Sequence, residues 1–290
     1  MCSGIGGFEL GLEHSIPNAG TVWQVEIDPY CRSILAKHWP HSERFSDVKT
    51  VGKHNLQPVE ICCFGWPCQD HSNAGSKLGL AGEKSSIWGE VFRVAFCELR
   101  PPIIVMEQVP AIASRDRGFG EVLGAISEIG YSARFDVISC AAVGSVHRRD
   151  RMFFICWRDL TDSESNACNV RGFNEHNKTT LPAQPGAEDR ADATDSDGSR
   201  RAQLRSAEPG QAQLETAQRY RSRIGIEPNP WHKTSGSICP VDDGLPGRVA
   251  MLRALGNSIS PQVAAVVGLK VGEVLKALSV GRDPARVLGF

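Results

Sequence analysis

Residues 59–69 read VEICCFGWPCQ, and this stretch decides the fold of the chain. Its first six residues form a short apolar run, which is typical of a strand buried in an α/β sheet, and the Gly65-Trp66-Pro67 that follows predicts a turn. Ligands of open α/β sheets bind beyond the carboxyl ends of the strands, where this turn carries Cys68. Cys68 is either one more buried cysteine or a nucleophilic thiolate, and the proline before it and the polar residues after it favour exposure.

Strand-like and helix-like segments alternate on both sides of this run. Residues 21–26, 103–106, 135–138 and 152–156 have the composition of strands, and residues 29–38, 86–99 and 119–129 have that of helices. Repeated strand–helix units predict the α/β class, with a mostly parallel sheet covered by helices on both faces.

The alternation stops near residue 158. Residues 159–246 carry 14 acidic and 10 basic residues and few apolar runs, a composition typical of loops and irregular structure. A helix returns at residues 261–278. We therefore divide the chain into a first domain at 1–158, a variable region at 159–246, and a segment at 247–290 that returns to the first domain.

Composition excludes several classes of protein. A net charge of −1 over 290 residues argues against a uniformly basic nucleic-acid coat. No uninterrupted apolar run of membrane-spanning length and no signal peptide are visible, so we expect a cytoplasmic chain with no membrane contact. The ten cysteines form no Cys-x-x-Cys pair, which argues against a metal site and a disulfide scaffold.

A glycine-rich turn, Ser3-Gly4-Ile5-Gly6-Gly7, opens an expected helix near the N-terminus. Such a turn either lets the backbone approach a ligand or is merely tight. Glu26 ends the next expected strand, where acidic residues bind ribose hydroxyls in nucleotide-binding folds. Because no lysine or arginine flanks the turn in sequence, an adenosine ligand without phosphates fits better than a dinucleotide.

Three further groups are candidates for chemistry. Glu107 directly follows the apolar residues 103–106, and it is either a proton donor or a solvated acid at the end of a strand. His147-Arg148-Arg149-Asp150-Arg151 offers arginines to a phosphate or a base, or is a surface charge run. Asn257 and Ser258 offer amide and hydroxyl groups, or cap the last helix.

In this order, these pieces resemble the DNA cytosine-5 methyltransferase family. Cys2-Ser3-Gly4-Ile5-Gly6-Gly7-Phe8 is similar to its first cofactor motif, Gly65-Trp66-Pro67-Cys68-Gln69 to its nucleophile motif, Glu107-Gln108-Val109 to its Glu-Asn-Val, residues 147–151 to its Gln-x-Arg-x-Arg, and Gly256-Asn257-Ser258 to its last motif. The matches cover residues 2–158 and about 245–275, in the family order.

The resemblance implies a Rossmann-like S-adenosylmethionine methyltransferase sheet with a smaller, irregular target recognition region at 159–246. It implies methyl transfer to C5 of cytosine in duplex DNA through a covalent Cys68 adduct and a flipped-out base. The implied catalytic residues are Cys68, Glu107, Arg149 and Arg151. The implied cofactor-binding residues are Ser3, Gly4, Ile5, Gly6, Gly7, Glu26, Ile27, Asp47, Val48, Pro67, Asn257 and Ser258.

The resemblance also implies double-stranded DNA as partner, a restriction endonuclease in the same system, a monomer, and a bacterial or bacteriophage source. Two alternatives remain open from the sequence: an RNA cytosine-5 methyltransferase with the same motifs, and a catalytically weak DNA-binding protein on a truncated methyltransferase fold. A methyl-transfer assay on duplex DNA and on transfer RNA distinguishes all three.

The chain departs from the family pattern in four places. Cys2, Gln108 and His147 replace the usual Phe, Asn and Gln. The strand that normally ends in Asp-Leu-Phe before the glycine turn is missing or shortened, since only residues 1–3 precede Gly4. Because that strand lies in the middle of the sheet, we expect a form with reduced stability and cofactor affinity.

Overall fold

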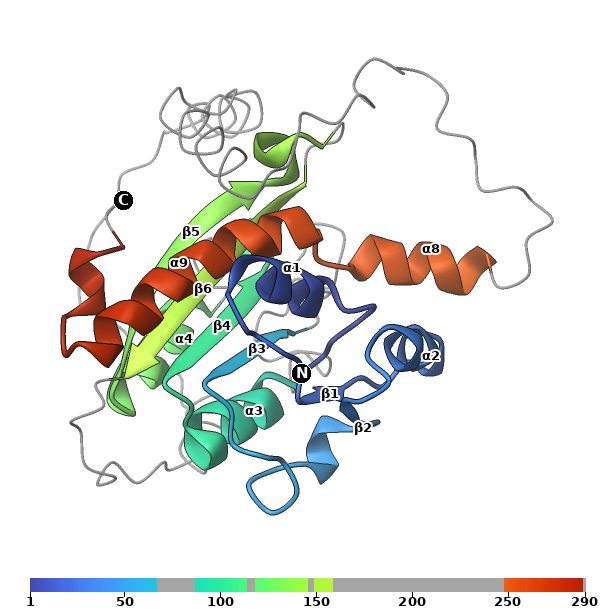
Figure 1. Cartoon of the computed structure of the whole chain (residues 1–290), viewed down its shortest axis with the longest axis horizontal. Helices are drawn as coiled ribbons and strands as arrows, with labels where there is room; N and C mark the ends of the chain where they lie inside the picture. Colours follow the sequence, from blue (N-terminus) through green and yellow to red (C-terminus); the bar gives the residue numbers. More distant parts are fainter. Residues whose placement is uncertain (67–86, 114–117, 146–148, 159–247, 289–290) are drawn as a thin grey trace, which may run out of the picture.

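The computed structural model describes residues 1–66, 87–113, 118–145, 149–158 and 248–288 (Figure 1). In these residues, β1 (Trp23–Val25) and β2 (Glu43–Phe45) form a parallel pair. A four-stranded sheet has the order β3-β4-β6-β5, with β3 at Ile61–Gly65, β4 at Ile103–Gln108, β5 at Tyr131–Ser139 and β6 at Asp150–Arg158. The α/β class is confirmed.

The expectation of a mostly parallel sheet is wrong for its second half. β3 and β4 are parallel, and α3 (Ile87–Phe92) with the π-helical η4 (Arg93–Leu99) lies between them in sequence. β6, however, is antiparallel to both β4 and β5. Between β5 and β6 the structure describes only the short η6 (Cys140–Val143), and parallel pairing requires a crossover of a dozen or more residues.

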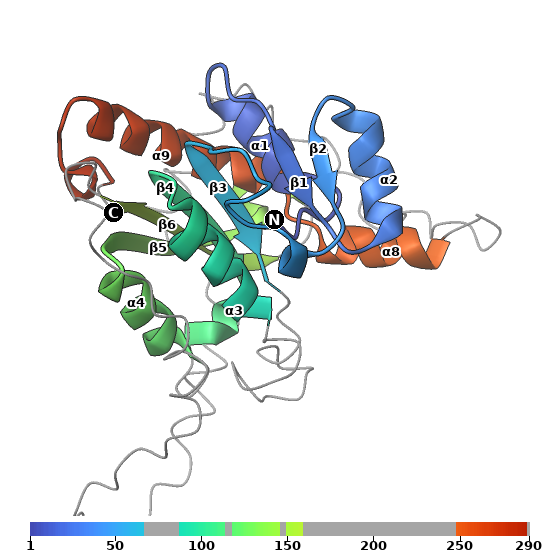
Figure 2. The same ribbon diagram turned by 90° about the horizontal axis from the view of Figure 1, so that it is seen from below.

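Helices cover both faces of the four-stranded sheet (Figure 2). On one face lie α1 (Gly7–Ser15) and α9 (Pro261–Ser279), which pack against each other and share a core with β4 and β6. On the other face lie α3, η4 and α4 (Phe119–Glu128). The remaining described helices are α2 (Pro29–His38), α8 (Arg248–Asn257) and the 3-10 turns η1 (Val48–Thr50), η5 (Pro110–Ala113) and η8 (Pro284–Arg286).

Glycines allow α1 and α9 to approach closely. A methyl group at Gly11 would lie 2.4 Å from Cβ of Ala264 and 2.6 Å from the carbonyl oxygen of Pro261. At Gly268 it would lie 2.0 Å from Oγ of Ser15. This contact fixes the C-terminal helix against the helix that follows the glycine turn.

The stretch Val249–Ser279 is long and apolar enough, by length and composition, to cross a membrane. Within it, α9 places Val263, Val267 and Val271 in the core shared with the sheet. That packing is what a core helix of a globular domain shows, and such helices pass the same test.

Residues 1–3 lie between the two sheets, where the resemblance implies a first strand (Figure 2). The amino group of Met1 donates a hydrogen bond to the Cys63 carbonyl oxygen on β3 at 2.7 Å, and the Ser3 N–H donates to the Val25 carbonyl oxygen on β1 at 3.1 Å. Beside Met1 is a cavity of about 240 Å³, lined in part by Trp23 and Ile61. Residues 1–3 therefore connect the two sheets through these hydrogen bonds, with the cavity beside Met1.

Candidate active site

Three strand ends of the four-stranded sheet bring sequence-predicted motifs to one edge. β3 and β4 run toward this edge, and β6 begins there because it is antiparallel to β4. Trp66 follows β3, Glu107 lies at the end of β4, and Arg151 lies at the start of β6. Three separate sequence motifs therefore meet at the edge where open α/β sheets bind ligands.

Glu107 and Arg151 form an ion pair at this edge. Nε of Arg151 lies 2.8 Å from Oε1 of Glu107, and the two side chains are 22% and 14% exposed. Burial raises the pKa of the Glu107 carboxyl above its usual range, although the Arg151 and Arg149 guanidinium groups and the hydrogen bond from Arg151 act in the opposite direction. A carboxyl with a raised pKa is suited to donate a proton.

Gly65 makes room for this carboxyl. The two residues pair across β3 and β4, and a methyl group at Gly65 would lie 2.9 Å from Oε2 of Glu107. A side chain at position 65 would therefore push Glu107 from its place. This close approach explains a glycine at the start of the Gly65-Trp66-Pro67-Cys68-Gln69 motif.

Arg149 contacts the protein's own main chain rather than only facing a substrate. Its guanidinium donates to the carbonyl oxygens of Gly256 at 2.6 Å and Ser258 at 2.8 Å. Arg149 thus ties the residue before β6 to the end of α8 and the start of the link to α9. Asn257, the last residue of α8, is exposed, and the hydroxyl of Ser258 donates to the Leu255 carbonyl oxygen at 2.9 Å.

The glycine turn and Glu26 are held together. Oε2 of Glu26 accepts a hydrogen bond from the Gly4 N–H at 2.7 Å, and Oε1 accepts from the Asp28 N–H at 2.9 Å. Gly4 has a φ of +55°, and a methyl group there would meet no atom within 4 Å. Gly4 therefore borders open space beside an acidic side chain, which fits an adenosine-type ligand with ribose hydroxyls.

The other two glycines of the turn serve packing. A methyl group at Gly6 would lie 2.3 Å from the Trp39 ring, and one at Gly7 would lie 2.2 Å from the Ile259 carbonyl oxygen. Because Gly7 has no side chain, the glycine turn can pack directly against the main chain of Ile259, just before α9. Ser3 and Ile5, between and beside these glycines, are partly buried.

The expected adenine-binding residues follow β1 and β2. Ile27 is 70% exposed beside Glu26, and its side chain offers a free apolar surface. Asp47 accepts from the Lys49 N–H at 2.9 Å and so caps η1, while Val48 is buried in the core. In this structure Val48 therefore supports the loop through packing, and Asp47 has its carboxylate at the helix start.

Pro67, Cys68 and His147 lie outside the described residues, so their geometry stays a prediction. Cys68 is three residues from Gly65, which limits their Cα separation to about 10–11 Å at full extension. Since Gly65 pairs with Glu107, the nucleophile motif leaves the sheet beside that carboxyl.

Sequence reasoning missed two polar residues near the site. The Arg32 guanidinium donates to the carbonyl oxygens of Glu26 at 2.9 Å and Ile27 at 2.6 Å, and so fixes the turn after β1. Glu9 on α1 is buried, and burial raises its pKa. The sequence offered no clear signal for Arg32, whereas an acid among apolar residues of an amphipathic helix was a signal for Glu9.

Comparison with known proteins gives the same family that the motifs indicate. The model of the family described as C-5 cytosine-specific DNA methylase matches residues 1–227. Type II methyltransferase M2.BsuMI of Bacillus subtilis is 30% identical over 162 residues, which are 53% of this chain and 40% of that protein. Type II methyltransferase M.HhaI of Haemophilus parahaemolyticus is 28% identical over 175 residues, or 60% of this chain and 50% of that protein.

Solved structures support the fold. The methyltransferase EhMeth of Entamoeba histolytica has a TM-score of 0.55 at 15% identity and covers 91% of this chain and 94% of its own. The Dnmt2 methyltransferase of S. pombe has a TM-score of 0.53 at 17% identity, with 95% and 97% covered. The chain spans about half the length, or less, of the two curated relatives named above. Because the family model covers residues 1–227 of 290, this chain belongs to the C-5 cytosine-specific DNA methylase family.

Proposed function

We propose that this chain transfers a methyl group from S-adenosylmethionine to C5 of cytosine in duplex DNA. The observation that carries the proposal is the partly buried Glu107–Arg151 pair, which lies where the cysteine motif leaves β3. Family membership supports the same reaction.

In the proposed mechanism the Cys68 thiolate adds to C6 of a flipped-out cytosine, and its electron pair becomes the new C–S bond. Glu107 in its protonated form donates its proton, or a hydrogen bond, to N3, so that negative charge does not build up on the ring. The raised pKa of Glu107 supports this role, because the acid stays protonated nearer to neutral pH than an exposed glutamate. Arg151 pairs with the Glu107 carboxyl, and in this mechanism it would also hold O2 of the base.

S-adenosylmethionine supplies the methyl group that C5 receives. The residues that would hold it are Ser3–Gly7, Glu26, Ile27, Asp47, Val48, Pro67, Asn257 and Ser258. Gly4 and Glu26 fit it best, since they border open space and offer a carboxylate for hydroxyl groups. Loss of the C5 proton to a base and departure of the Cys68 thiolate from C6 then restore the aromatic ring.

We propose that Arg149 positions the segment 256–258 in this reaction. Its two hydrogen bonds to main-chain carbonyls support that role. We also propose that residues 1–158 and 247–290 form the catalytic unit and that residues 159–246 select the DNA sequence. The packing of α9 on α1 supports the first part of this division. The arginines between residues 200 and 223 would contact phosphate.

A transfer assay tests the proposal. Purified chain is incubated with radiolabelled S-adenosylmethionine and either unmethylated duplex DNA or transfer RNA, and the Cys68→Ala variant is the control. We expect label in DNA only and none with Cys68→Ala. Label in transfer RNA alone, or no label in either with intact cofactor binding, would overturn the proposal. Sequencing of methylated cytosines in expressing cells identifies the target site.

A further inference from the structure

The outer edge of β5 is open in the part of the chain that the structure describes. β5 is the last strand of the four-stranded sheet and pairs only with β6 among the described strands. It is nine residues long, and an edge of this length presents a row of main-chain donors and acceptors to other strands.

The hydrogen-bond pattern shows which residues face outward. The Cys140 N–H just after β5 donates to the Arg149 carbonyl oxygen, so even-numbered residues of this segment face β6. The Val137 N–H instead donates to Oδ1 of Asp136 at 2.7 Å. In an antiparallel ladder this alternation means that the main-chain groups of Ala133, Phe135 and Val137 point away from β6.

The side chains along this edge are exposed and partly apolar. Phe135 is 43% exposed and Val137 is 36% exposed, and both lie on the face of the sheet that carries α4. Arg134 and Asp136 are exposed on the opposite face, since successive side chains alternate. A basic and an acidic residue thus stand one position before and one after Phe135.

We propose that β5 pairs antiparallel with β5 of a second copy of this chain, with Phe135 at the two-fold axis. In this register Phe135 faces Phe135 as a hydrogen-bonded pair, because its main-chain groups point outward. Arg134 of each copy then lies opposite Asp136 of the other, in the closer, non-hydrogen-bonded pairing. The strand is therefore complementary in charge to itself, which identifies a second copy as the occupant.

The same register explains the Asp136–Val137 contact. Val137 would face Ala133 of the second copy, and its N–H would exchange the Asp136 carboxylate for the Ala133 carbonyl oxygen. The carboxylate released in this way meets the guanidinium of Arg134 from the second copy. In the single chain, Asp136 covers a donor that would otherwise lack a protein partner at the edge.

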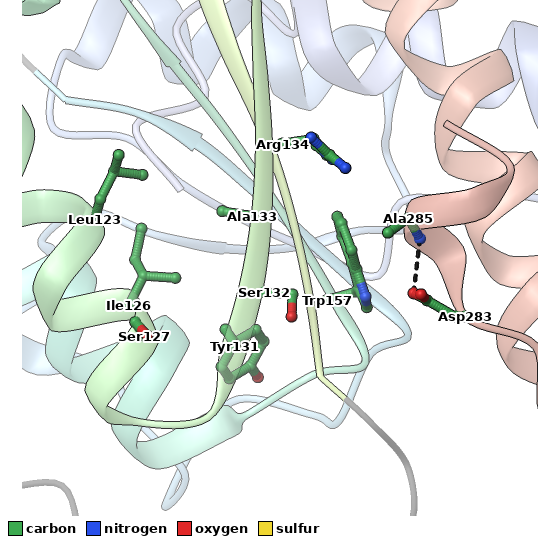
Figure 3. A pocket seen from close by; sticks show the side chains of 10 residues that line it. All are labelled: Leu123, Ile126, Ser127, Tyr131, Ser132, Ala133, Arg134, Trp157, Asp283 and Ala285. Atoms are coloured by element: carbon green, nitrogen blue, oxygen red, sulfur yellow. Dashed lines mark hydrogen bonds between the residues drawn. The ribbon is translucent and has the colours of Figure 1, made fainter. Parts of the chain in front are cut away.

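A cavity at the beginning of β5 leaves room for the second strand. It has a volume of about 450 Å³, and Leu123 and Ile126 of α4 line one side while Arg134 and Asp283 line the other (Figure 3). Side chains 136–139 of the second copy would approach this end. The two strands run in opposite directions, so the two active edges face away from each other and remain open to DNA.

Sedimentation of the full chain tests the inference, which replaces the monomer expected from the sequence with a weak dimer. Over roughly 1 µM to 1 mM, the range of weak dimers, we expect the wild type to shift from monomer to dimer. Arg134→Asp or Asp136→Arg alone places like charges opposite each other twice, and should raise the dissociation constant at least about tenfold. The double variant Arg134→Asp/Asp136→Arg restores opposite charges and should restore the dimer.

Neither residue touches the proposed active site, so melting temperature and methyl transfer per chain serve as controls for folding. A wild type that stays monomeric throughout the range refutes the pairing. Single variants that dimerise as the wild type does, or a double variant that melts normally and fails to recover dimerisation, refute it as well.

Discussion

Replacing Arg149 by methionine tests whether this arginine acts through the segment 256–258 or directly on DNA. The side chain makes two charge-assisted hydrogen bonds, to the carbonyl oxygens of Gly256 and Ser258. Hydrogen bonds to charged groups contribute about 1.5–3 kcal/mol each when buried. One of these is exposed to solvent, so we discount the pair to a total of about 2–3 kcal/mol.

If cofactor binding requires Asn257 and Ser258 to be ordered, the free energy lost with these two hydrogen bonds weakens the binding of the cofactor. At 1.4 kcal/mol per factor of ten, the dissociation constant of S-adenosylmethionine should rise about 30- to 140-fold. Isothermal titration calorimetry measures it without DNA. Arg149→Lys keeps the charge but lacks the planar guanidinium that can donate two hydrogen bonds. Its dissociation constant for S-adenosylmethionine should therefore lie between those of the wild type and Arg149→Met.

Arg253→Met is the matched control, because Arg253 is an exposed arginine on α8 close to the same segment. It should bind cofactor as the wild type does. If Arg149→Met also binds cofactor with wild-type affinity but loses DNA methylation, the arginine acts on the DNA and the positioning role is wrong.

Four further predictions follow from the same structure. Cys68→Ala should abolish methyl transfer and leave cofactor affinity unchanged in calorimetry; full activity would contradict the nucleophile assignment. Gly11→Ala should lower the free energy of unfolding by about 1–3 kcal/mol through overlap with α9, whereas Gly124→Ala on α4, with no atom within 4 Å, should raise it by about 0.5–1 kcal/mol in denaturant titrations. The pKa of Glu107 is raised in the folded chain, so its contribution to stability is present below the unfolded value of 4.5 and is lost as pH rises through the folded value. Over the same rise in pH, kcat/KM should fall because Glu107 loses its proton, and Glu107→Gln should remove this pH-dependent fall. Joining an extended, apolar strand ahead of Met1 should raise the melting temperature and the affinity for S-adenosylmethionine, because such a strand would fill the cavity between β1 and β3; equal values with and without it would show that the position needs no strand.

Much of the fold could be predicted because its signals are local. The helix at 29–38 begins with a proline, and Asp28 before it accepts hydrogen bonds from the N–H groups of Tyr30 and Cys31. The apolar strand at β4 and the helix α4 likewise follow from short-range patterns. The direction of β6 could not be predicted in this way. It depends on which strands lie side by side, and apolar runs look alike in parallel and antiparallel sheets.

The site shows the same division between residue type and geometry. The sequence identified Glu107 and Arg151 as separate candidates, and only the fold joins them at 2.8 Å, across the end of β4 and the start of β6. It identified a glycine turn with room for a ligand, but only Gly4 borders such room, while Gly6 and Gly7 make way for Trp39 and Ile259.

Arg149 shows why a motif does not determine what each of its side chains contacts. Arg149 directly precedes β6 and Arg151 is its second residue, so only Asp150 separates the two arginines. Arg151 meets the Glu107 carboxyl, whose pKa burial raises, and Arg149 meets two main-chain carbonyls more than 100 residues away in sequence. Two arginines of one motif thus contact the Glu107 carboxyl at the end of β4 and the C-terminal segment before α9. A chain that preserves both arginines therefore preserves a physical link between the expected cofactor site and the expected base site.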